Sequence, residues 1–161
     1  MKYMESVKKY KSRLFKRIPP WIREHMSIRE RLALYFRQIR GYVIYYILDE
    51  QNKLASYCML KHNYLNKYTF IKSRDVLINP YCTLPQYRNN NYASTIISCL
   101  LQDKEEKWQR LYALVKTDNS PSMHVLEKQG FVQIGYSRRK HFRHVLSNKA
   151  SDVVIYEFLK Q

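Results

Sequence analysis

Three consecutive asparagines stand between an arginine and an apolar run in the stretch LPQYRNNNYASTII, residues 84–97. The residues before them predict the end of a strand, and those after Asn91 predict the start of a helix. The first amides of a helix have no acceptor within it, and the helix dipole adds positive potential there. Such a turn can bind phosphate or pyrophosphate, with Arg88 adding a charge. The alternative is an ordinary polar turn that caps the helix.

Glycine is rare in this chain, which contains only Gly41, Gly130 and Gly135. Loops that bind phosphate commonly use glycine, because it adopts positive φ and lets successive amides converge. Asparagine is the usual substitute in that backbone region. We therefore predict that asparagines of the 89–91 run occupy positions where another chain would use glycine.

The composition indicates a single globular domain whose partners are anionic. The chain has 161 residues, is 45% apolar and carries a net charge of +16. This charge favours an anionic ligand, an acidic membrane surface or nucleic acid. No apolar run approaches the ~20 residues of a membrane span, and the N-terminus lacks an apolar signal core. We therefore expect a cytoplasmic protein.

Neither the cysteines nor the histidines show the spacing of metal ligands. The three cysteines form no CxxC pair, which favours buried, reduced thiols. We expect no metal site, and Cys82 lies on a strand close to the asparagine loop. The residues concerned are the three cysteines, Cys58, Cys82 and Cys99, and four of the five histidines, His62, His124, His141 and His144.

The elements that must position the loop begin with helices and continue as alternating strands and helices. Their order predicts an α+β fold of three αβα layers, with a mixed, mostly antiparallel sheet. We expect a basic helical N-terminal part over residues 1–40. The predicted helices are 3–17, about 21 or 27 to 37, 92 to about 108, and 119–130; the predicted strands are 42–48, 54–60, 68–71, 75–81, 110–116, 131–136 and 153–159.

Two motifs resemble the signatures of the GNAT acyltransferase superfamily, as found in small bacterial acetyltransferases. The first signature is Arg/Gln-x-x-Gly-x-Gly/Ala, and Arg88 and Ala93 match its ends. Asn91 stands at the middle glycine. The second signature is an asparagine, a small residue three positions on and a helix ending in Gly-Phe, as from Asn119 to Phe131.

The resemblance covers residues 42–158, and its specific part is 84–131. It implies one GNAT-like domain over 1–161 with the acyl-CoA N-acyltransferase fold, in which the parallel central strands 75–84 and 110–115 splay apart. It also implies that acetyl-CoA is the acyl donor and that a primary amine attacks it directly, with no metal. The coenzyme-binding residues it implies are Cys82, Leu84, Arg88, Asn89, Asn90, Asn91, Tyr92, Ala93, Ser94, Asn119 and Ser122.

The catalytic groups follow the family pattern less closely. Family members commonly place a tyrosine, the acid for the leaving thiolate, four residues before the glycine of Gly-Phe, where this chain has Leu126. Asp75 is the candidate base that takes the proton of the amine, with a structural ion pair at the strand start as the alternative. Candidate replacements for the acid are Tyr81, Tyr87 and Tyr136.

Three other readings of the sequence compete with this one. Residues 1–17 mix aromatic and basic side chains, which indicates a peripheral position on the anionic inner face of the membrane; alternatively they cover one side of the sheet. The cluster 138–143 suggests nucleic-acid binding, although the chain has no recognisable nucleic-acid motif. The third reading is a domain that binds coenzyme A without catalysis. Neither the acceptor nor the oligomeric state follows from the sequence.

Overall fold

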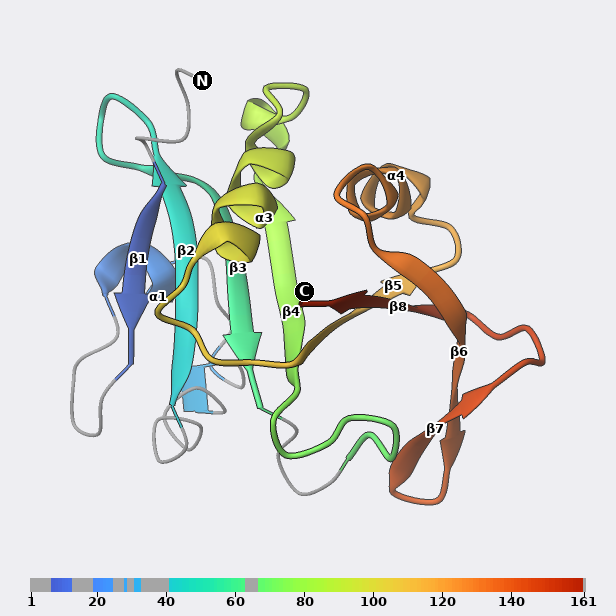
Figure 1. Cartoon of the computed structure of the whole chain (residues 1–161). Helices are drawn as coiled ribbons and strands as arrows, with labels where there is room; N and C mark the ends of the chain where they lie inside the picture. The colour runs from blue at the N-terminus through green and yellow to red at the C-terminus, as the bar shows by residue number, and fades with distance from the viewer. Residues whose placement is uncertain are drawn as a thin grey trace. The chain divides into compact units, whose positions relative to one another are not determined.

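A computed structural model describes residues 7–12, 19–24, 28, 31–32, 41–62 and 67–160. The described strands form one mixed sheet in the order β1-β2-β3-β4-β5-β8-β6-β7 (Figure 1). This matches the predicted fold class. In chain order the elements are β1 (Lys8–Lys11), α1 (Pro20–Arg23), β2 (Tyr42–Leu48), β3 (Leu54–Lys61), β4 (Val76–Thr83), the 3-10 turn η3 (Pro85–Tyr87), α3 (Tyr92–Gln102), β5 (Arg110–Lys116), α4 (Ser120–Lys128), β6 (Val132–Lys140), β7 (Arg143–Ser147) and β8 (Val153–Leu159).

The chain separates into two compact units of internal contacts. The first unit comprises residues 1–61 and 80–99, and the second comprises 62–79 and 100–161. Strand β4 belongs to both, because its first half lies in the second unit and its last half in the first. Among the described residues, no helix is long and apolar enough to cross a membrane.

The first unit is built on an antiparallel sheet in which β2 pairs with both β1 and β3. Its core includes Tyr10, Tyr42, Ile44 and Met59, all nearly excluded from solvent. The prediction of a helix over 3–17 is wrong for Lys8–Lys11, which form a strand; most of the remainder lies outside the described residues. Pairing with β2 overrides the local preference: Ser12 N–H donates to Tyr42 C=O at 2.9 Å.

The predicted second helix is described only in parts. Pro20–Arg23 form α1, and Ile28, Arg31 and Leu32 are helical. Ile28 and Leu32, which the spacing placed on an apolar stripe, are 74% and 56% exposed. Residues 25–27, 29–30 and 33–37 of this segment lie outside the described residues.

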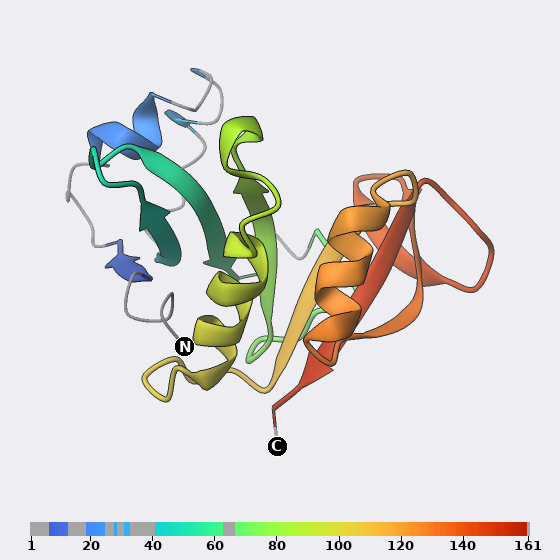
Figure 2. The ribbon, with the colours of Figure 1, turned by 90° about the horizontal axis from the view of Figure 1, so that it is seen from above.

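The second unit contains the parallel step of the sheet. Residues Val76–Ile78 pair in parallel with Leu111–Ala113, and β4 continues to Thr83 beyond the last paired position. Strand β8 pairs antiparallel with both β5 and β6, and β6 pairs with β7. Figure 2 shows the orange helix α4 lying against this part of the sheet. The core of the second unit includes the buried side chains of Ile71, Leu77, Tyr112 and Ile155.

Three further predicted elements need correction. Segment 68–71 is not a strand, because it contributes only an isolated bridge from Tyr68 to His144 followed by a turn. Helix α3 ends at Gln102, so Trp108 lies outside it and packs on Phe158 instead, with ring centroids 6.2 Å apart. The strand expected over 131–136 continues to Lys140 and returns as the unpredicted β7.

Candidate functional site

The asparagine loop begins where β4 ends beside β3. Leu84 N–H donates to Ala55 C=O at 3.0 Å, which holds the end of the strand in the sheet. Pro85 then starts the 3-10 turn η3, which the Arg88 N–H closes on Pro85 C=O at 3.3 Å. Strand, turn and helix therefore follow one another as the sequence predicted.

Two of the three asparagines adopt the left-handed backbone region. Asn89 has φ 66° and Asn91 has φ 58°. An asparagine tolerates this region better than most side chains, but glycine alone enters it without a steric cost. In the signature Arg/Gln-x-x-Gly-x-Gly/Ala, Asn91 occupies the position of the middle glycine, and Asn89 occupies a position where glycine is common. Asparagine thus supplies the positive φ that the glycine-poor loop requires.

The side chain of Asn90 has a different role from its two neighbours. Its Nδ2 donates to Tyr87 C=O at 3.2 Å and to Arg88 C=O at 3.4 Å. These bonds tie the middle of the loop back onto the 3-10 turn. Asn90 is therefore a local brace, while Asn89 and Asn91 redirect the backbone.

The loop leads into the N-terminus of α3. The first bond of this helix runs from Thr95 N–H to Asn91 C=O at 3.0 Å, and Thr95 Oγ1 donates to the same oxygen at 3.1 Å. The amides of Ala93 and Ser94 precede this bond and have no acceptor within the helix. Together with the helix dipole and the exposed Arg88, they form an arrangement suited to an anion.

A tyrosine–carboxylate contact anchors the loop to the β2–β3 turn. Tyr87 OH donates to Asp49 Oδ2, while Asp49 Oδ1 accepts from the backbone N–H groups of Gln51 and Lys53 at 2.9 and 2.8 Å. The hydrogen bond with Tyr87 lowers the pKa of Asp49, and the same bond raises the pKa of Tyr87. The two residues lie 38 positions apart, so no local sequence signal indicates the contact.

Along β4 the backbone N–H and C=O groups of successive residues point alternately toward β3 and away from it. The Leu84 N–H is engaged by Ala55, and Cys82 C=O accepts from Ser56 Oγ at 3.2 Å. Successive residues of a strand direct their N–H and C=O groups to opposite edges. Tyr81 and Thr83 therefore direct theirs away from β3. Burial raises the pKa of the Cys82 thiol, and the Arg88 charge opposes this.

The second motif forms the helix that the sequence predicted. Asn119 Oδ1 accepts from Ser122 N–H at 3.3 Å and caps α4, which has proline in its first turn. The helix stops before Gly130, which has φ 86°. Leu126 is fully buried, so the position of the family tyrosine here belongs to the core. The polar atoms of Asn119 and Ser122 lie at the exposed start of α4.

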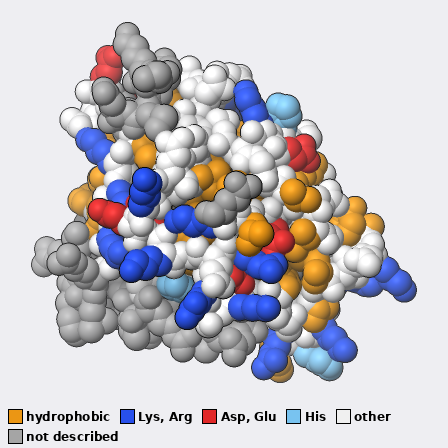
Figure 3. Space-filling view, viewed as in Figure 1, with side chains coloured by type: hydrophobic (Ala, Val, Ile, Leu, Met, Phe, Trp, Pro, Cys, Tyr) orange, Lys and Arg blue, Asp and Glu red, His pale blue; other side chains and the backbone are white. Residues whose placement is uncertain are grey.

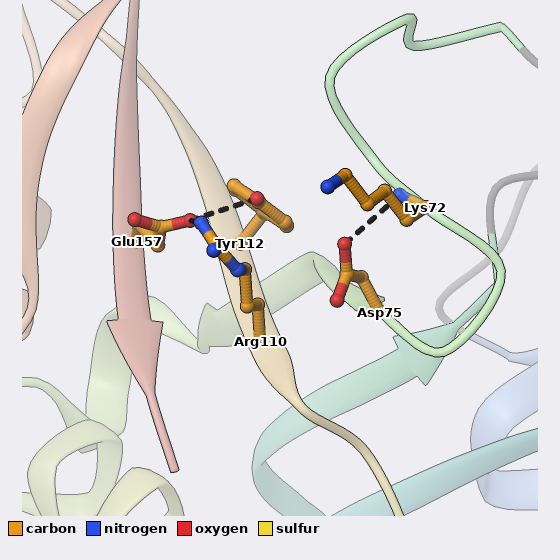
Figure 4. A network of polar contacts seen from close by, with 5 residues as sticks. All are labelled: Lys72, Asp75, Arg110, Tyr112 and Glu157. Atoms are coloured by element: carbon orange, nitrogen blue, oxygen red, sulfur yellow. Dashed lines mark hydrogen bonds and ion pairs between the residues drawn. The ribbon is translucent and has the colours of Figure 1, made fainter.

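The side chain of Asp75 closes a turn at the entry to β4. Its Oδ2 accepts from Lys72 N–H at 2.9 Å, and Asp75 N–H donates to Lys72 C=O at 3.1 Å (Figure 4). The residue is only 2% exposed. Both contacts are hydrogen bonds with the Lys72 backbone rather than the ion pair considered as the alternative, and the role of Asp75 as a base stays a prediction.

A second polar group crosses from β5 to β8. Glu157 Oε1 accepts from Tyr112 OH and from Arg110 Nη1, each at 2.8 Å (Figure 4). Tyr112 is 3% exposed and packs edge-on against Phe70. Burial, followed by the bond to Glu157, raises the pKa of Tyr112.

We predict that Tyr112 makes the protein less stable in alkali. A raised folded-state pKa means that the protonated phenol stabilises the fold below the unfolded value near 10, and this contribution is lost as the pH rises above it. Urea unfolding between pH 8 and 11 should show a steeper loss for wild type than for Tyr112→Phe. At pH 8 the variant should lose about 1.5–3 kcal/mol, the range for a hydrogen bond to a charged group. Parallel pH profiles would contradict the assignment.

The other two catalytic candidates stay predictions. Tyr81 lies on β4 in the first unit and Tyr136 lies on β6 in the second, and both side chains are half-buried. Among the residues that the structure describes, no three His, Cys, Asp or Glu side chains cluster as metal ligands.

Comparison with known proteins places the two motifs in context. Residues 7–131 match the model of the family described as Acetyltransferase (GNAT) family. A mutant form of the spermidine/spermine N-acetyltransferase SpeG from Vibrio cholerae has 21% identity and a TM-score of 0.57, covering 83% of this chain and 77% of its own. An acetyltransferase (GNAT family) from Bacillus anthracis has 25% identity and a TM-score of 0.53, covering 73% and 66%.

A third structure is similar over almost its whole length. A putative GNAT acetyltransferase from Desulfovibrio desulfuricans has a TM-score of 0.64 at 11% identity and covers 96% of this chain and 99% of its own. At such identities the likeness concerns the fold. A search of curated proteins found no match.

Proposed function

Because the chain belongs to the GNAT acetyltransferase family, we propose that it transfers the acetyl group of acetyl-CoA to a primary amine. In this proposal the loop 88–94 binds the pyrophosphate of the coenzyme, as the resemblance implied. The observation that carries it is the positive φ of Asn89 and Asn91 at positions where the family signature uses glycine.

The donors available in the loop fit a diphosphate. The amides of Ala93 and Ser94 precede the first helical hydrogen bond, and Arg88, at the start of the same loop, is exposed. The anchor from Tyr87 to Asp49 and the brace from Asn90 fix the loop from either side. The resemblance implied Cys82 and Leu84 for the coenzyme, but their backbone groups are engaged by Ser56 and Ala55. We therefore assign the pairing with the pantetheine arm to the neighbouring backbone groups of Tyr81 and Thr83, since strand alternation directs them away from β3.

In this reaction the amine nitrogen attacks the thioester carbonyl, so that a C–N bond forms and the C–S bond breaks. A base must take the proton of the amine, and an acid must protonate the thiolate that leaves. The roles of Asp75, Tyr81 and Tyr136 in those proton transfers remain part of the proposal. The buried Leu126 supports a second candidate, a domain that binds coenzyme A without catalysis.

The net charge bears on the class of acceptor. A charge of +16 repels polycations at long range and attracts anions. We therefore propose an acceptor that carries phosphate or carboxylate beside its amine, rather than a polyamine of the kind named for the Vibrio cholerae enzyme.

Acetyl-CoA should raise the thermal stability of the protein. Ligand at ~100 times its Kd stabilises a fold by about 2.7 kcal/mol, which a thermal-shift measurement detects. Release of free thiol is then followed with spermidine and with amine-bearing phosphates. The absence of a shift would contradict both candidates, and a shift without thiol release would favour binding without catalysis. Faster turnover of spermidine would contradict the assigned acceptor class.

A further inference from the structure

The β6–β7 hairpin ends in a short, well-defined tip. Lys140 pairs with Arg143 across the strands, so only His141 and Phe142 form the connection. His141 adopts φ 53°, and Arg139 Nε donates to the His141 C=O at 3.2 Å. The tip therefore has a fixed turn that presents the next residue, Phe142, to solvent.

Phe142 is 90% exposed, more than any other large apolar side chain in the described part of the chain. A phenyl ring buries a large apolar area when it finds a partner, so its exposure here leaves that stabilisation unused. The adjoining hollow of about 300 Å³ is lined by Thr69, Lys140, His141, Phe142, Arg143 and Val145.

The hairpin is also strongly basic. Residues 129–151 contain no aspartate or glutamate, but they contain five exposed cations: Arg138, Arg139, Lys140, Arg143 and Lys149. In the part of the chain that the structure describes, none of the five forms an ion pair. Figure 3 shows basic and histidine side chains gathered at the lower right edge of this face, over β6 and β7.

A further cation is held beside β7. The His144 N–H donates to Lys67 C=O at 2.7 Å, and Thr69 N–H donates to His144 C=O at 3.0 Å. Burial lowers the pKa of His144, and the charges of Lys67 and Arg139 lower it further. The charges of Lys67 and Arg139 thus act close to His144 and add to the positive charge of the hairpin.

We propose that the tip of the β6–β7 hairpin docks on a bilayer surface containing anionic phospholipid. Phe142 enters the region between headgroups and acyl chains, while the surrounding cations pair with lipid phosphates. A bilayer fits better than nucleic acid, because nucleic-acid stacking needs aromatic side chains along a groove or sheet face, whereas this ring stands alone at an apex. The proposal does not depend on acetyl transfer.

Vesicle co-sedimentation tests it with vesicles of phosphatidylcholine alone and with an equal amount of phosphatidylglycerol. We expect salt-sensitive binding only to the anionic vesicles. Arg138→Gln with Arg143→Gln should weaken it roughly 30-fold, from about 1 kcal/mol per cation, and Phe142→Ser about tenfold. The matched control, Lys104→Gln with Lys107→Gln, removes two exposed charges after α3 and should keep wild-type affinity.

Several outcomes would overturn the hairpin as the docking surface. These are equal binding to neutral vesicles, equal losses in the hairpin and control variants, or tighter binding of single- or double-stranded nucleic acid at the same salt. Binding lost only when Lys8, Lys9 and Lys11 become glutamine would instead assign the surface to β1. Because β1 is part of the sheet, substitution is a better test than deletion. Circular dichroism and the acetyl-CoA thermal shift verify that each variant is folded.

Discussion

Replacing Asn91 with valine should weaken the binding of acetyl-CoA by roughly tenfold or more. Asn91 has φ 58°, a region in which a β-branched residue is a genuine outlier. Backbone strain of this kind costs about 1–3 kcal/mol, which the loop relieves by leaving the conformation that aims its amides. Titration calorimetry on the variant gives the affinity, and its melting temperature reports whether the fold survives.

The three asparagines provide their own controls. Asn91→Gly removes the cost of positive φ without moving the loop, so affinity should stay equal or rise a few-fold. Asn90→Gly removes the hydrogen bonds to Tyr87 and Arg88, so the affinity for acetyl-CoA should fall. The two variants thus introduce the same residue with different expected results. A folded Asn91→Val protein with wild-type affinity, or the same sign for both glycine variants, would contradict this loop as the pyrophosphate site.

The elements that were predicted correctly are those whose signals lie within the element itself, such as an apolar run, a helix cap or a terminating glycine. The strands Arg110–Lys116 and Val153–Leu159 match their predicted bounds, because each is an apolar run without glycine or proline. The start and end of α4 follow from the Asn119 cap and Gly130. The positive φ in the asparagine run followed from the scarcity of glycine, which leaves few other residues able to adopt it.

Elements that depend on distant partners were not predictable in this way. The basic segment Lys8–Lys11 has no alternating apolar pattern that indicates a strand, and only its pairing with β2 makes it one. Strand β7 consists of RHVLS, which gives no alternation strong enough to predict it. The anchor from Tyr87 to Asp49 is likewise a tertiary contact, so the sequence offered Tyr87 as a candidate acid instead.

Gly135→Ala should destabilise the protein by roughly 3 kcal/mol, the combined scale of strained backbone and overpacking. Gly135 has φ 147° at a register shift of β6 against β8. An added Cβ would lie 2.9 Å from Ser147 O and from a Leu146 methyl. The oxygen belongs to the backbone of β7, so it moves only if the β6–β7 pairing is disturbed.

Gly41→Ala separates the two costs that Gly135→Ala combines. Gly41 also has positive φ, 76°, but an added Cβ would meet nothing within 4 Å. Gly41→Ala should therefore lower the free energy of unfolding only by the cost of the strained backbone, about 1–2 kcal/mol. Urea unfolding of both variants measures the two losses. Because the Gly135 clash falls on the hairpin, Gly135→Ala should also weaken vesicle binding, whereas Gly41→Ala should not. If Gly41→Ala were as destabilising as Gly135→Ala, close packing of β6 on β7 would not be the cause.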